Sequence, residues 1–226
     1  MEIRNFFVEK GQGEALILLH GNGEDSSYFV AQIEEFSKYY HVYALDTRGH
    51  GRSPRGRAEF TIRQFAEDLK AFFDRQGIEK AHVLGFSDGA NIAMIFALRY
   101  PQLVDRLILN GGNLNGRGVK DSVQLPIVMG YKLALKSAAR SDSARRKAEL
   151  LGLMVNDPDI EPAELFNIKA KTLVLAGDRD MIKEDHTRLI SCCIPNGELC
   201  IIKGDHFIAA NATEEYNQVV LEFLRS

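Results

Sequence analysis

Short apolar runs alternate with amphipathic segments along most of this chain, and that alternation constrains the fold more than any other feature. Residues 15–19 (Ala-Leu-Ile-Leu-Leu) are apolar throughout, as expected for a strand covered on both faces. Residues 62–73 instead place their apolar side chains at helical spacing. Strands that alternate with such helices predict an α/β fold with a mostly parallel sheet and helices on both of its faces.

The predicted strands and helices divide the chain into a core and an insertion. The runs that indicate strands are 3–8, 15–19, 42–45, 81–84, 107–109, 172–176 and 199–202. The segments that indicate helices include 26–39, 62–76, a stretch after residue 87 and 216–224. The alternation fails between residues 113 and 166, where helical stretches rich in Leu, Ala and Lys appear. We therefore expect a core of residues 1–112 and 167–226, with residues 113–166 inserted as a small helical cap.

Composition excludes several classes of protein. The formal net charge is −3, and no stripe of Lys and Arg mixed with aromatic residues appears, so we expect no nucleic-acid partner. No apolar stretch approaches the length of a transmembrane helix, and the first residues carry charge without an apolar run behind them. The three cysteines, an odd number, do not form a disulfide framework. These features predict a cytoplasmic protein with no membrane partner.

The strongest chemical signal is Gly85-Phe86-Ser87-Asp88-Gly89, at the junction of a predicted strand and a predicted helix. Glycines on both sides of the serine permit a sharp turn that exposes its hydroxyl above the sheet. The positive end of the following helix dipole favours developing negative charge. Ser87 is therefore the candidate nucleophile, although an ordinary strand-to-helix turn would produce the same pattern.

A serine hydroxyl needs a base, and the chain has six histidines. His206 follows the last predicted strand, so it is expected at the same sheet edge as Ser87. The imidazole in turn needs a carboxylate to fix its tautomer. Asp178 and Asp180 both follow the strand at 172–176; Asp180 is the favoured acid, and Asp178 is the alternative.

An oxyanion also needs donors, and two backbone groups are placed to supply them. His20-Gly21-Asn22-Gly23 follows a buried strand, and its glycines leave the N–H of Asn22 free to point into a site. The N–H of Asp88 is the natural second donor. No cluster of His and carboxylate residues has the spacing of a metal site, so neither a metal nor a cofactor is predicted.

Together these segments resemble the α/β-hydrolase fold family. The resemblance spans nearly the whole chain and includes residues 20–23, 46–53, 85–89, 177–180 and 204–206. It implies an eight-stranded sheet, a cap inserted after the sixth strand, and an ester, thioester or amide bond as the target. The Ser87-Asp88 pair is similar to that of biphenyl hydrolase-like esterases and proline-iminopeptidase-like proteins. Family members that open epoxides or remove halogens carry an aspartate at the elbow, and Ser87 argues against those reactions.

The sequence predicts a small-molecule ester-type substrate and leaves its charge and the oligomeric state open. Asp88 could attract an amine, whereas the basic residues of the insertion could attract an anion; both groups are equally suited to solvated or helix-capping roles. Other functions also remain open. A ligand receptor, a lyase or a cofactor-free haloperoxidase could use the same site. A nicotinamide-binding enzyme is a further alternative, because Gly21-Asn22-Gly23 follows a strand and Asp46 ends the next one.

Overall fold

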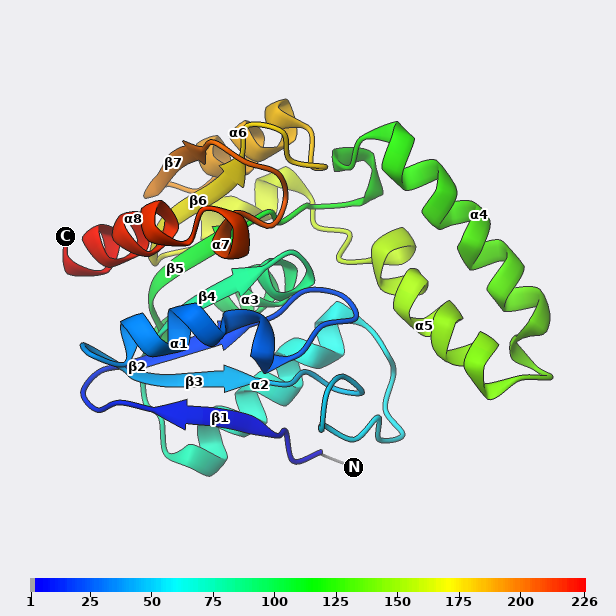
Figure 1. Ribbon diagram of the computed structural model, residues 1–226, viewed down its shortest axis with the longest axis horizontal. Helices are drawn as coiled ribbons and strands as arrows, with labels where there is room; N and C mark the ends of the chain where they lie inside the picture. Colours follow the sequence, from blue (N-terminus) through cyan, green and yellow to red (C-terminus); the bar gives the residue numbers. More distant parts are fainter. Residues whose placement is uncertain (1–2) are drawn as a thin grey trace.

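The computed structural model describes residues 3–226 and has three layers, with one sheet between two groups of helices (Figure 1). The strands are β1 (Phe7–Lys10), β2 (Ala15–Leu19), β3 (His41–Leu45), β4 (Ala81–Phe86), β5 (Val104–Asn110), β6 (Lys171–Gly177) and β7 (Gly197–Ile202). The α-helices are α1 (Val30–Phe36), α2 (Ile62–Gln76), α3 (Asp88–Arg99), α4 (Asp121–Ala138), α5 (Asp142–Asn156), α6 (Glu184–Cys193), α7 (Ile208–Asn211) and α8 (Thr213–Arg225). The predicted α/β class is confirmed.

Within residues 3–226 the sheet has seven strands, in the order β1-β3-β2-β4-β5-β6-β7, so the prediction of an eight-stranded sheet is wrong. Only β1 runs antiparallel to its neighbour, with Phe7 opposite Leu45. Each of the seven apolar runs of the sequence forms one strand, and no further run was present to build an eighth. The first strand also begins later than residue 3, because the N–H of Phe6 donates to the Ser53 hydroxyl at 2.8 Å instead of to a neighbouring strand. Residues 1 and 2 of the predicted core lie outside the described part of the chain.

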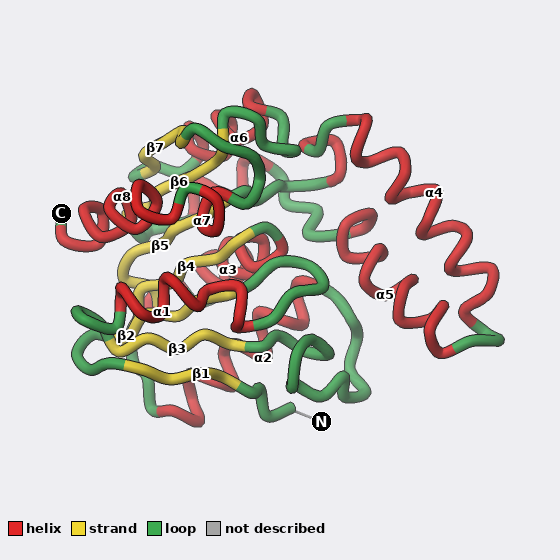
Figure 2. Tube along the Cα trace, viewed as in Figure 1, coloured by secondary structure: helices red, strands yellow, loops and turns green. Residues whose placement is uncertain are grey.

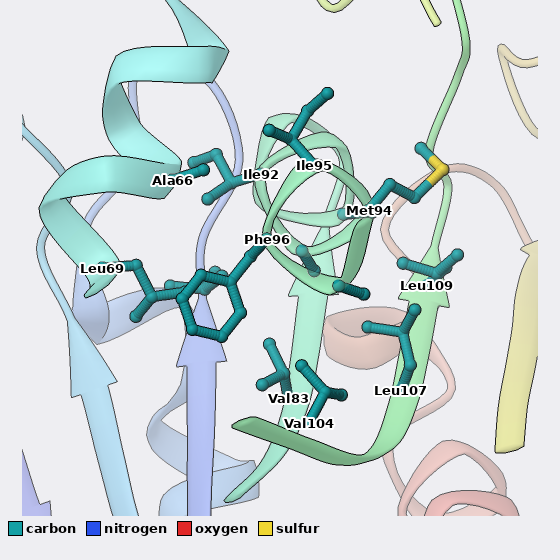
Figure 3. Close-up of a cluster of buried hydrophobic side chains, with 14 of the residues drawn as sticks. Ala66, Leu69, Val83, Ile92, Met94, Ile95, Phe96, Val104, Leu107 and Leu109 are labelled. Atoms are coloured by element: carbon teal, nitrogen blue, oxygen red, sulfur yellow. The ribbon is translucent and has the colours of Figure 1, made fainter. Parts of the chain in front are cut away.

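Two apolar clusters hold the layers together. One joins α2, α3 and α6 to a face of the sheet. Figure 3 shows part of it, where Phe96 of α3 lies beside Leu69 of α2 and Ile92 lies beside Ala66. The other joins α1 and α8 to the opposite face through buried side chains such as Phe36 and Tyr216. Helices therefore cover both faces, as the fully apolar strands predicted.

The first predicted helix forms in two pieces. A 3₁₀ turn, Ser26–Phe29, precedes α1, and the Asp25 carboxylate accepts a hydrogen bond from the N–H of Ser27 at its start. The structure also places all parallel strands with their carboxyl ends at one edge, where the loops of Figure 2 gather. Any residues that directly follow β2, β4, β6 and β7 are thereby brought to a common edge.

Between β5 and β6 the chain forms a pair of helices, α4 and α5, which lies outside the three layers (Figure 1). The pair falls within residues 113–166. Helix α5 lies nearer the sheet and α4 is outermost. In residues 3–226, no helix combines the length and the apolar content that crossing a bilayer demands.

One buried ion pair fixes the loop that follows β3. The Arg48 guanidinium is fully buried and donates to both carboxylate oxygens of Asp68 in α2, at 2.6 and 2.5 Å. Such a two-point contact holds a fork-shaped cation to a carboxylate in one geometry. The loop is thereby attached to the helix layer.

We expect Asp68→Asn to lower the free energy of unfolding by about 3–5 kcal/mol, because it leaves the Arg48 charge buried without its partner. Urea denaturation followed by circular dichroism measures this. Asp74→Asn in the same helix is the control, because Asp74 is exposed and its ion pair with Lys70 lies at the surface. Equal losses in the two variants would contradict the importance of the buried pair.

Candidate active site

The turn between β4 and α3 gives Ser87 an unusual backbone. Its φ is 53° and its ψ is −118°, and within residues 3–226 Asp159 is the one other non-glycine residue with a positive φ. The N–H of Ser87 donates to the carbonyl of Asn110 at 2.8 Å, which holds the turn against β5. A strained serine between a strand and a helix is typical of a nucleophile elbow.

Glycine is required on both sides of this turn because the backbones approach closely. A Cβ at Gly89 would lie 2.0 Å from the carbonyl oxygen of Leu19, and one at Gly85 would lie 2.1 Å from that of Gly89. No side chain fits in either position. The glycines singled out in the sequence are thus a packing requirement of the elbow.

Three predicted site residues meet at this edge of the sheet. Nε2 of His206 lies 3.0 Å from Oγ of Ser87, and Nδ1 of His206 lies 2.7 Å from Oδ1 of Asp180. His206 and Asp180 are both buried. The imidazole can accept the serine proton on one nitrogen while donating to the carboxylate from the other, which is the arrangement that serine activation requires.

The alternative acid, Asp178, has a different role. Its Oδ1 accepts a hydrogen bond from the N–H of Gly204 at 2.9 Å, and its own N–H donates to the carbonyl of Ile202 at 2.9 Å. Asp178 therefore ties the loop after β6 to the loop after β7. Asp180, two residues further on, is the carboxylate that faces the imidazole.

The predicted oxyanion donors lie on adjoining segments. The Asn22 amide donates to Oδ2 of Asp88 at 2.8 Å, which joins the loop after β2 to the first residue of α3. Within the described chain, the backbone N–H groups of Asn22 and Asp88 make no hydrogen bond to another residue. Backbone N–H groups without a partner are available to donate hydrogen bonds to an oxyanion.

The same Asn22 amide also reaches the insertion, because it donates to the carbonyl of Leu150 in α5 at 2.9 Å. Two further contacts hold α5 at this edge. Arg55 donates to Glu149 at 2.7 Å, and Arg146 donates to the carbonyl of Gly49. Asn22 is therefore the point where the loop after β2, the elbow and the inserted helices meet.

Asp88 is a buried carboxyl group in the first turn of α3. Burial raises its pKa to about 6, although the hydrogen bond from Asn22 acts in the opposite direction. The carboxyl group of Asp157, at the end of α5, also has a pKa of about 6 because of burial, and its charge contributes to the rise at Asp88. Burial likewise raises the pKa of Glu24, whose carboxylate accepts a hydrogen bond from the N–H of Gly21 at 3.0 Å.

One functional position was missed in the sequence. Gly111, which follows β5, has a φ of 63°, and a Cβ there would lie 2.7 Å from Cε1 of His206. It would also lie 2.9 Å from Nδ1 of that ring. Gly111 thus makes room for the imidazole; an isolated Gly-Gly pair after a strand carried no signal that could distinguish this from an ordinary turn.

Asp46 and His20 hold the surrounding loops. The Asp46 carboxylate accepts hydrogen bonds from the N–H of Ser26 at 2.8 Å and from that of Arg52 at 2.7 Å. The Asp46 carboxylate therefore binds backbone N–H groups. In a nicotinamide-binding enzyme, the corresponding carboxylate would bind the ribose hydroxyl of the cofactor. Nε2 of His20 accepts a hydrogen bond from the N–H of Thr47 at 3.0 Å, and burial lowers its pKa, which favours the neutral ring.

Comparison with known proteins identifies the family of this chain. A family model described as the alpha/beta hydrolase fold matches residues 14–129, just over half of the chain. A protein of Escherichia coli named 2-hydroxy-6-oxononadienedioate/2-hydroxy-6-oxononatrienedioate hydrolase is 31% identical over 268 residues, covering 98% of this chain and 91% of its own. The chain belongs to the alpha/beta hydrolase fold family.

Solved structures include chains with a similar fold. The enol-lactonase of Burkholderia xenovorans superposes with a TM-score of 0.80 at 21% identity, covering 99% of this chain and 97% of that one. The meta-cleavage product hydrolase of Pseudomonas fluorescens superposes with a TM-score of 0.80 at 22% identity, covering 99% and 94%. At these identities the likeness establishes the fold alone.

Other relatives are similar to this chain over only part of their own length. Uncharacterised proteins of Mycobacterium bovis and Mycobacterium tuberculosis are 36% identical over 106 residues, which is 47% of this chain and 31% of theirs. The chain thus spans about a third of the length of these relatives.

We expect Gly111→Ala to reduce turnover about 100-fold, because the new Cβ displaces the His206 ring and a shift of about 1 Å in such a group can cost that factor. Steady-state kinetics on an activated ester measures it. Gly77→Ala is a matched control: its φ is 67°, but nothing lies within 4 Å of the added atom. That variant should lose stability from the same backbone strain and keep its turnover; equal turnover in both variants would contradict the proposed contact.

We expect Asp88→Asn to be more stable than the parent protein at pH 8, by about 1–3 kcal/mol. The folded pKa of about 6 lies above the usual 3.8, so the folded state binds the proton more tightly than the unfolded state. The buried charge therefore destabilises the parent above pH 6, and the difference between the proteins should shrink as the pH falls toward 4. Urea denaturation at several pH values measures it.

The control for this pH series is Asp185→Asn, which removes an exposed aspartate from the first turn of α6. It should not show the same gain at pH 8. A stability difference for Asp88→Asn that is independent of pH would contradict the raised pKa.

Proposed function

We propose that this protein is a serine hydrolase that cleaves an ester, thioester or amide bond of a small molecule through an acyl-enzyme on Ser87. The observation that carries the proposal is the continuous hydrogen-bonded path from Ser87 through His206 to Asp180, with distances of 3.0 and 2.7 Å. The strained backbone of Ser87 supports it, because that conformation presents the hydroxyl at the loop-bearing edge of the sheet.

In the proposed first step, Oγ of Ser87 attacks the carbonyl carbon and its proton moves to Nε2 of His206. The carbonyl oxygen becomes an oxyanion that accepts hydrogen bonds from the N–H groups of Asn22 and Asp88. The intermediate then collapses, and His206 gives the proton to the leaving alcohol, thiol or amine. Asp180 accepts a hydrogen bond from Nδ1 throughout, which stabilises the charged ring.

In the second step, water attacks the acyl-enzyme. His206 takes a proton from the water, a second oxyanion forms at the same donors, and the proton returns to Oγ of Ser87 as the acid leaves. Each donor of this kind contributes on the order of 10²–10³ in rate in measured enzymes. The free N–H groups next to Ser87 are therefore as important to the proposal as the three side chains.

Residues 113–166 are proposed to cover this site as a cap. Helix α5 is held at the catalytic edge by its contacts with Asn22, Arg55 and Gly49. The insertion is also paired with the loop that carries Asp180, since Val119 forms an antiparallel bridge with Ile182. A cover attached on both sides of Ser87 suits a small acyl substrate better than a polymer.

A carboxylic ester is favoured over an amide as the target because an alcohol leaves the tetrahedral intermediate more easily than an amine, so an ester demands less proton transfer from His206. The charge preference of the substrate stays undecided between Asp88 and the basic residues of the insertion. Comparing an aminoacyl ester with its uncharged analogue would distinguish them.

We expect a fluorophosphonate probe to label the protein at Ser87, and we expect Ser87→Ala to abolish that labelling. Turnover of nitrophenyl esters should fall by about 10⁴-fold or more in Ser87→Ala and in His206→Ala, because the two residues act as a unit. Mass spectrometry of the labelled peptide and steady-state kinetics measure these effects. Ser143→Ala, at an exposed position of α5, is the control.

Labelling that persists in Ser87→Ala would remove the proposed nucleophile. Labelling of Ser87 without turnover on any ester, together with tight binding of a small ligand, would favour a receptor function over hydrolysis. The proposal requires that the parent and the Ser143→Ala protein both turn over esters and that Ser87→Ala does not.

A further inference from the structure

The outer face of α4 exposes an unusual set of large apolar side chains. Leu125, Met129 and Leu133 are 62%, 71% and 68% exposed. Their spacing of four residues places them one above the other on the same side of the helix. We call these three residues the α4 stripe.

The other side of α4 already has a partner. Ala134 is buried there, and Gly130 lies near Leu151 of α5, since a Cβ at Gly130 would be 3.3 Å from that side chain. Figure 1 shows α5 between α4 and the sheet, and the high exposure of the stripe shows that its side chains do not pack on α5. Apolar residues gathered on one exposed face, in contrast to scattered single ones, indicate an interaction surface.

We propose that the α4 stripe is the contact with a second copy of this chain, with the two α4 helices antiparallel across a two-fold axis at Met129. The stripe is symmetric about its centre, because Leu125 and Leu133 lie four residues to either side of Met129. In an antiparallel pair, each Leu125 meets Leu133 of the other copy, and the two Met129 side chains meet at the axis. This is the self-complementarity that a two-fold contact requires.

The charges along α4 select the antiparallel direction. Asp121 begins the helix and forms an exposed ion pair with Lys183 of the same chain, whereas the exposed Lys132 and Lys136 lie in the second half of the helix. An antiparallel pair places the lysine-bearing half of one helix along the half of the other that begins with Asp121. A parallel pair would bring like charges together and would also align the two helix dipoles unfavourably.

The principal competing occupant is an anionic lipid surface. Residues 117–147 hold eight lysines and arginines against two aspartates, which would favour such a surface. The remainder of the chain, however, has 29 acidic residues against 20 basic ones, and this excess would be repelled by anionic lipid. The symmetry of the stripe has no counterpart in lipid binding, so a second copy is the better fit.

The contact is small, and its size determines how the dimer should behave. A helix of 18 residues is about 27 Å long, and one pair of such helices buries less than a standard protein interface. We therefore expect a dimer that depends on concentration. Sedimentation analysis of the wild-type chain over a series of concentrations should show reversible dimerisation.

A disulfide experiment tests the geometry directly. In a Cys192→Ser background, which removes the exposed native thiol, Met129→Cys should give a disulfide-linked dimer on mild oxidation, because the two-fold axis brings residue 129 next to its own copy. The control is Leu189→Cys in the same background. Leu189 is an exposed leucine of α6, 39% exposed and outside the stripe, and should cross-link far less.

A second set of variants tests the stripe itself. Leu125→Gln, Met129→Gln and Leu133→Gln together keep helix-forming residues on an exposed face, so the fold should persist, as circular dichroism can verify. The triple variant should be a monomer at every concentration at which the wild-type chain is a dimer. Leu189→Gln should leave the dimer unchanged.

Three outcomes would overturn the proposal. One is a wild-type chain that stays monomeric at all concentrations while Met129→Cys cross-links no more than Leu189→Cys. Another is a dimer that persists in the triple glutamine variant, which would place the interface elsewhere. The third is a monomer that binds vesicles containing phosphatidylglycerol but not vesicles of phosphatidylcholine, with loss in the triple variant, which would assign the stripe to lipid.

Discussion

The forced backbone turn at Ser87 is the constraint on which the rest of this structure depends. A residue held outside the common φ and ψ regions costs about 1–3 kcal/mol and persists only where its surroundings over-determine it. Here the surroundings are the hydrogen bond from Ser87 to Asn110 and the two glycines, 85 and 89, that let the backbones of β2, β4 and α3 approach. The buried core around α3 holds that helix in place (Figure 3).

The elbow is connected to the parts of the chain that surround it through a few polar contacts. Asn22 links the loop after β2 both to Asp88 and to the carbonyl of Leu150 in the insertion. On the other side of Ser87, the bridge between Val119 and Ile182 links the start of the insertion to the loop of Asp180. A movement of the inserted helices would therefore displace both the proposed oxyanion donors and the proposed acid.

The two helices of the insertion make different contacts. The inner helix, α5, contacts the catalytic edge through Asn22, Arg55 and Gly49, whereas the outer helix, α4, exposes the α4 stripe to solvent. Because α4 packs on α5, a second copy bound at the stripe would restrain the helix pair that we propose covers Ser87. Self-association and the cover of the site would in that case be coupled mechanically.

The sequence by itself determined the elements and the local backbone requirements. Apolar runs predicted all seven strands, and the glycines at 85 and 89 predicted a tight turn around Ser87, because both signals depend on residues that are neighbours in the chain. The eighth strand, expected from the family and not from an apolar run, is absent from residues 3–226. The order of the segments along the chain also predicted that His206 would lie near Ser87, although their role in catalysis stays a proposal.

Only the tertiary structure shows that Asp180, and not Asp178, contacts the His206 imidazole, and only it shows why residue 111 is a glycine. Asp178 and Asp180 lie in the same loop, and the choice depends on how that loop meets the one after β7, which no local pattern encodes. Likewise, residue 111 must be a glycine because the imidazole of His206, 95 positions further along the chain, occupies the space that a side chain at residue 111 would need. Strand register and close packing set these contacts, and they act between residues whose spacing in the sequence carries no signal.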